Sequence, residues 1–491
     1  MYKFVPAFFL IVHSVLSIVH CHEFNHRITQ IKIEGAPSYL TVPQNILPSL
    51  PVDYDDGTIK YAMLGISKFF SENGYPYNKV TMSTDVNNND SSAIIVRFIV
   101  DTDEKVCNGP VLIKGVKKNP QMYMRDVRLS PGQIYNSADL DETIRRLSMR
   151  PYVLNVNSAS PVIIEDAPLC NELRQAVTPI LITEKAGMDI EGVLGYESAR
   201  RGRKSSLSGY LNFSFINMLR LGERAEVSYT GMNSFQRLKV FASRPWVFSL
   251  PLEMGGSFEL EIEDEGYGYL GGEFFTAAEI DGRWKTGVAL RGSETVPPDT
   301  VERAYTFYGA DIFLYLIPQT WEMGKTVNEF SVRTGSGIAN RDKKITRSRA
   351  ELSAGSHLPL FTRYAIAGRV CGKTLFTDEQ YLPPAELYRY GGHNSMRGYS
   401  QEEFAFRSAL ISQTEALIYL SRSSSLFIFF DGGIGFQNPG AISVSDGQKM
   451  FGYGAGMRFP SRLGTVSLEW GRNIDDDGSL GRVHVGVKTG F

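Results

Sequence analysis

From residue 187 to the C-terminus at residue 491, the chain alternates apolar and polar residues in one segment after another. In GSFELEIED, Phe258, Leu260 and Ile262 lie on one side of an extended chain and glutamates lie on the other. Segments of about ten such residues, joined by turns, are typical of a transmembrane barrel that is apolar toward lipid and polar toward its lumen. At about 19 residues per strand and turn, residues 187–491 predict an antiparallel β-barrel of about 16 strands.

A large soluble β-protein is the alternative, because soluble sheets also alternate. Glutamate-rich faces repeated over so long a stretch favour the membrane barrel. The N-terminus favours it too, since residues 1–22 have a signal-peptide pattern: Lys3, then an apolar centre from Phe8 to Val19, then a polar exit. We expect cleavage between Ser17 and His22. A lipidated Cys21 is the alternative, although His20 lacks the small side chain that lipoprotein processing prefers.

Composition and motifs argue against two function classes. The formal net charge of −2 disfavours nucleic acid as a partner, because phosphate recognition requires a clear basic excess. The Gly-Lys-Thr triplets at 324–326 and 372–374 lack the earlier glycine of a phosphate-binding loop, and the seven histidines form no metal-ligand motif. We therefore predict no enzymatic activity, no metal and no cofactor.

Two mixed α/β units precede the barrel. In the first, residues 28–103, a strand is followed by a helix with Ile59, Ile66 and Phe70 on one face, and then by two strands. The second, residues 106–186, repeats this order, and Ser137 is the expected N-cap of its helix. Cys107 and Cys170 either pair in an oxidising compartment or remain isolated thiols, and the sequence favours neither.

This repeat resembles tandem polypeptide-transport-associated (POTRA) domains. NGYPYNKV (73–80) is similar to that family's segment after the second helix, and LSPGQIYNSADLDETIRRL (129–147) to its stretch leading into the next unit's second helix. The resemblance implies two periplasmic α+β domains ahead of the barrel.

A long polar stretch, residues 377–412, interrupts the barrel strands. Loops of this length are usually functional or disordered, and six tyrosines and phenylalanines make this one unlike a disordered segment. Within it, YGGHNSMRGYSQ (390–401) combines a hinge at Gly391 and Gly392 with Arg397.

Two later strands carry carboxylates that this arginine can reach. If Asp431 points into the lumen, then Phe427 and Phe429 on the same face do so as well, and an apolar cover is required. We predict that the aromatic loop folds inward over these rings. Arg397 would then pair with Asp431, and Glu415 on the preceding strand is a second acceptor.

GGHNSMRGY, TEALIYL, FFDGG and GYGAGMRFPSRLG follow one another, and together they resemble the BamA/TamA outer-membrane assembly superfamily (bacterial surface antigen barrel). In that family an Arg-Gly-Tyr/Phe loop folds into the lumen and its arginine contacts an aspartate. The resemblance assigns these places to Arg397, Gly398, Tyr399 and Asp431, and it makes Glu415 the acidic residue of the preceding strand. Met396 departs from the usual valine or leucine.

The resemblance implies insertion of other barrel proteins into the outer membrane of a Gram-negative-type bacterium. A barrel closes by pairing its first and last strands, here predicted at 189–197 and 483–491. Glycines weaken both strands, and a weak seam would open sideways and pair with an incoming strand. The predicted seam residues are Gly192, Gly195, Gly486, Gly490 and Phe491, the last resembling the terminal aromatic signal of outer-membrane barrels. Glycines that merely relieve crowding are the alternative.

The expected partners are unfolded outer-membrane proteins, outer-membrane lipid, and a periplasmic or inner-membrane protein at the POTRA-like domains. A secretion channel for one dedicated polypeptide is the main alternative. Such channels usually carry an N-terminal plug helix, for which residues 22–27 are too few. A passive porin is a third class, but porins need no POTRA-like domains.

Overall fold

The computed structural model describes residues 26–87, 90–164, 170, 172–185, 187–197, 206–232, 235–263, 266–280, 282–298, 304–317, 326–379, 382–437, 445–462, 464–475 and 481–488. The predicted signal peptide and the seam residues Gly490 and Phe491 lie outside these ranges. The chain forms two compact units, which we describe separately: residues 1–112, 128–141 and 159–179, and residues 113–127, 142–158 and 180–491.

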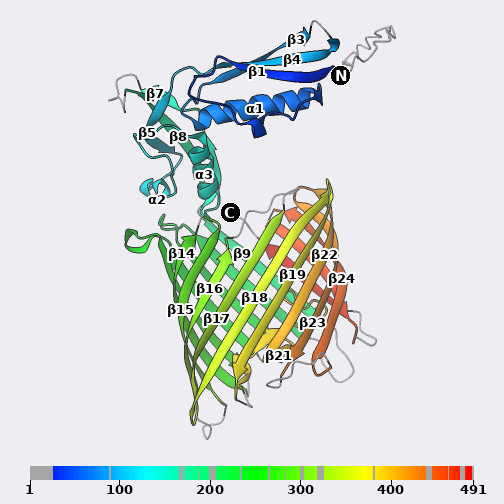
Figure 1. The fold of residues 1–491 in the computed structure, drawn as a ribbon. Coiled ribbons are helices and arrows are strands. Elements are labelled where there is room, and N and C mark those ends of the chain that lie inside the picture. The colour runs from blue at the N-terminus through cyan, green and yellow to red at the C-terminus, as the bar shows by residue number, and fades with distance from the viewer. Residues whose placement is uncertain are drawn as a thin grey trace, which may run out of the picture. The chain divides into compact units, whose positions relative to one another are not determined.

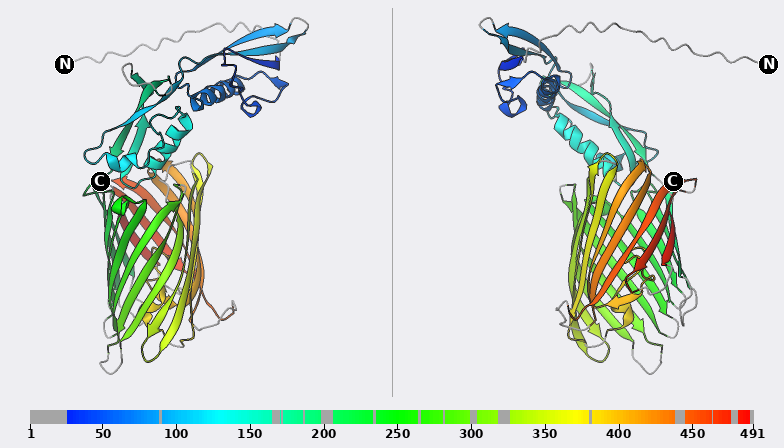
Figure 2. Two further views of the ribbon diagram at one scale, coloured as in Figure 1. Left: turned by 60° about the vertical axis from the view of Figure 1, so that its left-hand side comes forward. Right: turned by 90° about the vertical axis from the view of Figure 1, so that its right-hand side faces the viewer.

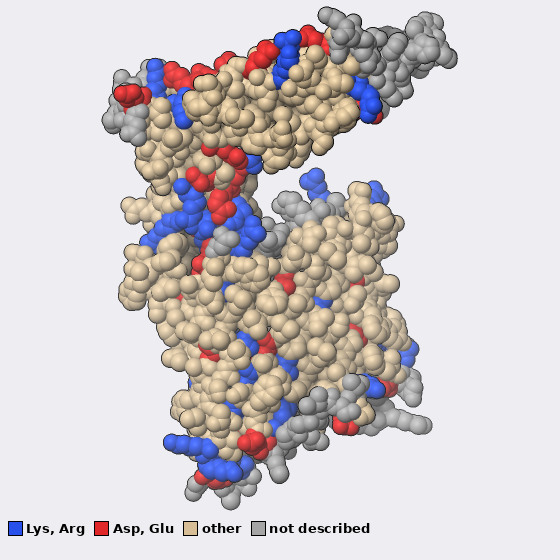
Figure 3. Space-filling model, viewed as in Figure 1, with Lys and Arg blue, Asp and Glu red and all other residues tan. Residues whose placement is uncertain are grey.

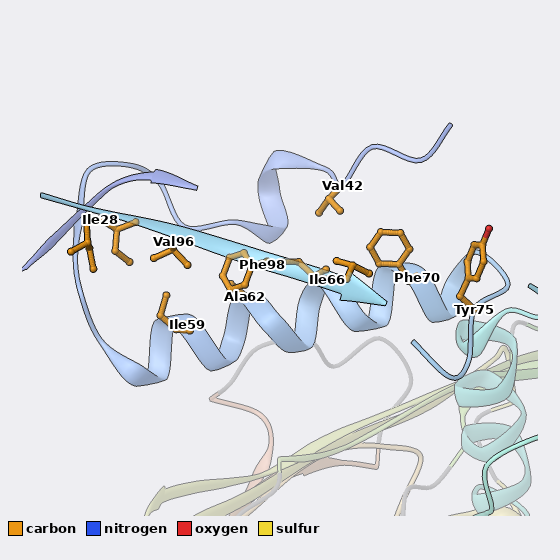
Figure 4. Close-up of a cluster of buried hydrophobic side chains, with 11 residues drawn as sticks. Ile28, Val42, Ile59, Ala62, Ile66, Phe70, Tyr75, Val96 and Phe98 are labelled. Atoms are coloured by element: carbon orange, nitrogen blue, oxygen red, sulfur yellow. The ribbon is translucent and has the colours of Figure 1, made fainter. Parts of the chain in front are cut away.

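The first sheet has the strand order β2–β1–β4–β3 and is packed against helix α1 (Figure 1). Its elements are β1 (Arg27–Glu34), η1 (Gln44–Ile46), β2 (Val52–Asp53), α1 (Asp56–Glu72), β3 (Lys79–Asn87) and β4 (Asp90–Asp101). The apolar stripe of α1 faces β4, so that Ile66 and Phe70 pack beside Phe98 (Figure 4). This is the predicted order of strand, helix and two strands, with the short β2 in addition.

The second sheet has the order β5–β8–β6, with β7 also paired to β8. Its elements are β5 (Val106–Lys114), α2 (Gln121–Met124), α3 (Ser137–Ser148), β6 (Val153–Ser158), β7 (Val162–Ile164) and β8 (Arg174–Glu184). The N-cap prediction is wrong by one residue. Ser137 is the first helical residue, and the Asn136 side chain accepts a hydrogen bond from the Ala138 amide at 2.8 Å. A disulfide joins Cys107 to Cys170.

No helix among the described residues is long and apolar enough to cross a membrane.

Sixteen antiparallel strands close into a barrel, which confirms the predicted architecture. They are β9 (Gly187–Glu197), β10 (Ser206–Ile216), β11 (Arg224–Met232), β12 (Phe235–Arg244), β13 (Leu252–Glu263), β14 (Tyr267–Ile280), β15 (Trp284–Val296), β16 (Tyr305–Leu316), β17 (Val327–Asn340), β18 (Lys344–Phe361), β19 (Tyr364–Thr377), β22 (Ser408–Ser421), β23 (Ser424–Phe436), β24 (Gln448–Ser461), β25 (Gly464–Asn473) and β26 (Arg482–Lys488). A short 3₁₀ turn, η2 (Val247–Ser249), links β12 to β13.

The alternation sorts side chains between the two faces of this wall. On β13, Phe258, Leu260 and Ile262 are exposed on the outside, whereas Glu261 is buried on the inside. Most of the barrel wall visible in Figure 3 is accordingly free of charged side chains. The outer face is therefore suited to lipid, and the charged residues available for a site lie in the lumen.

Candidate functional site

The segment between β19 and β22 folds back inside the barrel. It contains a 3₁₀ turn, η3 (Pro384–Glu386), and a two-stranded hairpin, β20 (Tyr388–Tyr390) and β21 (Phe404–Phe406). In both views of Figure 2 this yellow-to-orange hairpin lies within the outline of the barrel. The predicted range of 377–412 is too long at its end, because residues 408–412 already pair as strand β22; the loop itself is 378–407.

Gly391 and Gly392 stand where β20 turns toward the Arg-Gly-Tyr step. Their φ angles are +126° and +81°, in the region that side chains rarely adopt. A Cβ on Gly391 would lie 2.3 Å from the Ser400 carbonyl oxygen. The tip of the hairpin therefore requires glycine at this position for both conformation and space.

Arg397 lies against both predicted carboxylates. Its Nε donates to Asp431 Oδ2 at 2.8 Å, its Nη2 to Asp431 Oδ1 at 2.7 Å, and its Nη1 to Glu415 Oε1. Arg397 is 4% exposed and Asp431 is fully buried. The guanidinium fork thus spans β22 and β23 and fixes the orientation of the loop.

Arginines, rather than loop aromatics, cover the two inward phenylalanines. The guanidinium carbon of Arg397 lies 3.9 Å from the centre of the Phe429 ring, and that of Arg458 lies 4.1 Å from the centre of the Phe427 ring. Arg458 also donates to both oxygens of Glu415 at 3.0 Å. The prediction that loop aromatics cover these rings is therefore wrong in its detail. Cation–π stacking makes a phenylalanine compatible with a charged lumen.

The two residues after Arg397 bind the last strands of the barrel. The Gly398 carbonyl accepts hydrogen bonds from Asn473 on β25, at 2.7 Å, and from Arg482 on β26. The Tyr399 hydroxyl donates to Asp475 at 3.2 Å and accepts from the Phe451 amide at 3.0 Å. One Arg-Gly-Tyr step therefore contacts β22, β23, β24, β25 and β26.

Glycines in the wall allow this close approach. A Cβ on Gly452 of β24 would lie 1.8 Å from the Arg397 carbonyl oxygen, and one on Gly398 would lie 2.5 Å from the Arg472 carbonyl oxygen. Gly452 belongs to the GYGAG motif, but sequence reasoning assigned it no role. Only the packed structure shows that its missing side chain makes room for the loop backbone.

A second anchor holds the loop at another part of the wall, and sequence reasoning missed it. Arg389 and Glu402 of the loop join Arg237 of β12 and Glu261 of β13 in a cluster of charged side chains, in which Glu259 and Glu263 of β13 also take part. Both arginines also stack on Phe235, at 4.7 and 5.0 Å from its ring centre. In the strand order, six strands separate the pair β12–β13 from β22–β23 in either direction, so the loop bridges opposite walls.

The barrel closes where β9 meets β26, as predicted. The described pairs are seven, from Arg482↔Glu197 to Lys488↔Glu191, compared with fourteen between β17 and β18. Gly195 is opposite His484, Gly486 is opposite Val193, and Gly192 is opposite Val487.

Crowding explains only some of the seam glycines. A Cβ would approach Ser208 Oγ to 2.7 Å at Gly195 and Ser467 Oγ to 2.5 Å at Gly486. At Gly192 the nearest neighbour would be 3.5 Å away, which is ordinary contact. Gly192 therefore remains a glycine for which packing offers no reason.

The fold combines a closed sixteen-stranded barrel, a loop folded into its lumen and two preceding α/β sheets. This combination is the architecture of a membrane β-barrel with N-terminal α/β domains. Residues 314–491 match the Omp85 superfamily domain. The C-terminal part of the chain therefore carries an Omp85 superfamily domain, in agreement with the resemblance found in the sequence.

The solved structures show the same fold at low sequence identity. BamA from Haemophilus ducreyi lacking POTRA domains 1–3 is 12% identical, with a TM-score of 0.58 over 94% of this chain and 100% of that one. CdiB from Acinetobacter baumannii is 13% identical, with a TM-score of 0.56 over 94% of this chain and 90% of that one. Outer envelope protein 39, chloroplastic, from Arabidopsis thaliana is 27% identical over 161 residues, which are 31% of this chain and 43% of that protein.

Proposed function

We propose that this protein assembles β-barrel proteins in the outer membrane of a Gram-negative-type bacterium, with its POTRA-like domains in the periplasm. The Omp85 superfamily domain at residues 314–491 supports insertion or translocation of polypeptides in general. The POTRA-like sheets would receive unfolded client segments by strand addition, and the β9–β26 seam would open to pair with them. In this proposal the protein acts through hydrogen-bond exchange at strand edges.

One observation carries the proposal: the loop that is locked by Arg397 also holds the last strand. The Gly398 carbonyl accepts from Arg482 of β26, while Arg397 is bound to Asp431 and Glu415. A shift of the loop would therefore remove a hydrogen bond from the seam strand, which has only seven described pairs with β9. The loop position is thus coupled to the strength of the seam.

The experiment is a reversible lock across the seam. Leu194 of β9 and Val485 of β26 are direct partners, and both side chains are exposed on the outer face. The variant Leu194→Cys/Val485→Cys would form a disulfide that holds the seam shut. A matched control, Leu211→Cys/Tyr229→Cys, locks the outward pair of β10 and β11 instead.

We expect the oxidised seam lock to abolish insertion of barrel clients and reduction to restore it. The β10–β11 lock should leave activity unchanged under both conditions. Client insertion at the normal rate through the locked seam would contradict the proposal.

The secretion channel is the second candidate, favoured by the fold shared with CdiB. A channel passes its polypeptide through the lumen, so a seam lock should not affect it. Export of a dedicated polypeptide by the oxidised seam-locked variant would establish that function in place of assembly.

A further inference from the structure

Two neighbouring turns expose large apolar side chains at the barrel end where β9 begins. The turn between β10 and β11 presents Met218 and Leu219, and the turn between β12 and β13 presents Phe248 and Leu250. Phe248 is 84% exposed and Leu219 is 72% exposed. Of the other described turns at this end, the one at 422–423 has a polar tip, whereas the one at 362–363 is flanked by the exposed rings of Phe361 and Tyr364.

Both turns contain residues whose backbone lies in the left-handed region. Asn217, Arg220, Trp246, Phe248 and Ser249 all have φ between +53° and +61°. This left-handed region is uncommon for bulky residues and persists only where the surrounding structure imposes it. The turns also touch, because a Cβ on Gly222 would lie 3.0 Å from Pro245 Cγ.

Backbone amides of the first turn are satisfied within the turn. Asn217 Oδ1 accepts from the Gly222 amide at 2.9 Å, and the Glu223 carboxylate accepts from the amides of Leu219 and Leu221. In the second turn the Leu250 amide donates to the Val247 carbonyl at 3.1 Å. A segment that enters a lipid environment must satisfy its backbone in this way.

From these observations we infer that Met218, Leu219, Phe248 and Leu250 form an interfacial anchor that is buried in the lipid leaflet beside the seam. The inference rests on the membrane placement in the proposed function. Lipid is the occupant because the patch continues the apolar outer face: Leu252 and Met254 follow Leu250 along β13 on the side of Phe258. Such apolar and aromatic side chains prefer the membrane boundary.

This anchor would hold β9, the first strand of the seam, at a fixed depth in the bilayer. β10 pairs with β9, and β9 pairs with β26, so the first turn lies one strand from the closure. The four exposed side chains are uncharged, and Arg220 already pairs with Glu184 at 2.9 Å. Burial of the patch should therefore not depend on anionic lipid.

The test is a depth measurement on the full chain in phosphatidylcholine vesicles, with Cys21 and Cys371 replaced by serine. Phe248→Cys carries an environment-sensitive fluorophore, quenched either by doxyl lipids or by aqueous iodide. Ser423→Cys, in a polar turn at the same end, is the aqueous control, and Leu260→Cys, on the outer wall, is the control for bilayer insertion.

We expect shallow doxyl lipid to quench the label at 248 severalfold more strongly than the label at 423, with the reverse order for iodide. Iodide quenching at 248 equal to that at 423, with the label at 260 in lipid, would overturn the anchor while leaving the membrane placement intact. Protection from iodide without doxyl quenching would assign the patch to a protein and also overturn it. A label at 260 outside lipid would overturn both the anchor and the placement.

Discussion

Arg397 donates three hydrogen bonds to Asp431: from its backbone amide at 3.0 Å, from Nε at 2.8 Å and from Nη2 at 2.7 Å. Backbone and side chain are thus held by the same carboxylate. Both residues are buried. Removal of Arg397 therefore leaves the Asp431 carboxylate without its counter-charge, and removal of Asp431 leaves Arg397 with Glu415 alone. Loss of one partner from a buried ion pair typically costs about 3–5 kcal/mol. The pair consequently fixes where the loop lies and not merely which way its side chain points.

Arg397→Ala and Asp431→Ala should each lower client assembly without preventing membrane insertion of the barrel. The double variant should be no worse than either single variant, since the pair acts as a unit. Assembly yield and the heat-dependent gel mobility of the barrel measure the two effects.

Arg369→Ala is the matched control for these Arg397 and Asp431 variants. Arg369 pairs with Glu329 at 3.1 Å, but both side chains are about half exposed, so its loss should cost about 0–1 kcal/mol. Simple additivity of the Arg397 and Asp431 effects would refute a coupled pair.

Gly452→Ala should displace the loop, because the new methyl group would lie 1.8 Å from the Arg397 carbonyl oxygen. This oxygen belongs to the backbone, so it can move only if the loop moves with it. Overpacking of this kind costs about 1–3 kcal/mol. Faster proteolysis within residues 391–403 would report the displacement. Gly268→Ala on β14, where no atom lies within 4 Å of the added Cβ, should leave proteolysis unchanged.

The second anchor should act independently of the first. Glu402→Gln removes one charge from the cluster of Arg389, Arg237 and Glu261, which shares no partner with Arg397. The loop's resistance to proteolysis measures the effect of each variant. In the double variant Arg397→Ala/Glu402→Gln, the free-energy effects on this resistance should therefore add within about 0.3–0.5 kcal/mol. A double variant no worse than Arg397→Ala alone would show that the loop detaches from both walls at once.

Gly192→Ala should strengthen the seam, because the site has room and alanine is favoured over glycine in a strand by about 0.5–1 kcal/mol. We expect a more heat-resistant barrel and slower client insertion. Gly372→Ala on β19 has the same 3.5 Å clearance and lies away from the seam, so it should not slow insertion. Equal rates for the two variants would remove Gly192 from the gating mechanism.

The Cys107–Cys170 disulfide should stabilise the N-terminal region. It closes a segment with a sequence separation of 63, and removal of such a bond typically costs about 2–4 kcal/mol. Cys107→Ser/Cys170→Ser should therefore unfold at lower denaturant concentration, whereas Cys371→Ser should not. Identical denaturation of the two variants would mean that the bond does not contribute.

The sequence by itself determined the barrel, because side-chain direction alternates with a period of two and needs no knowledge of distant residues. The same rule placed Asp431 with Phe427 and Phe429 on the inner face. The pairing of Arg397 with Asp431 followed from charge and from the resemblance to a known family.

Only the tertiary structure decided the contacts that depend on strand register and barrel closure. Arg389 meets Glu261, and Glu402 meets Arg237, across a closed ring whose circumference no local pattern encodes. The stacking of Arg397 on Phe429 and the space left by Gly452 depend on packing at ångström scale. Periodicity specifies which face a residue occupies, whereas its partner on that face is set by the three-dimensional path of the whole chain.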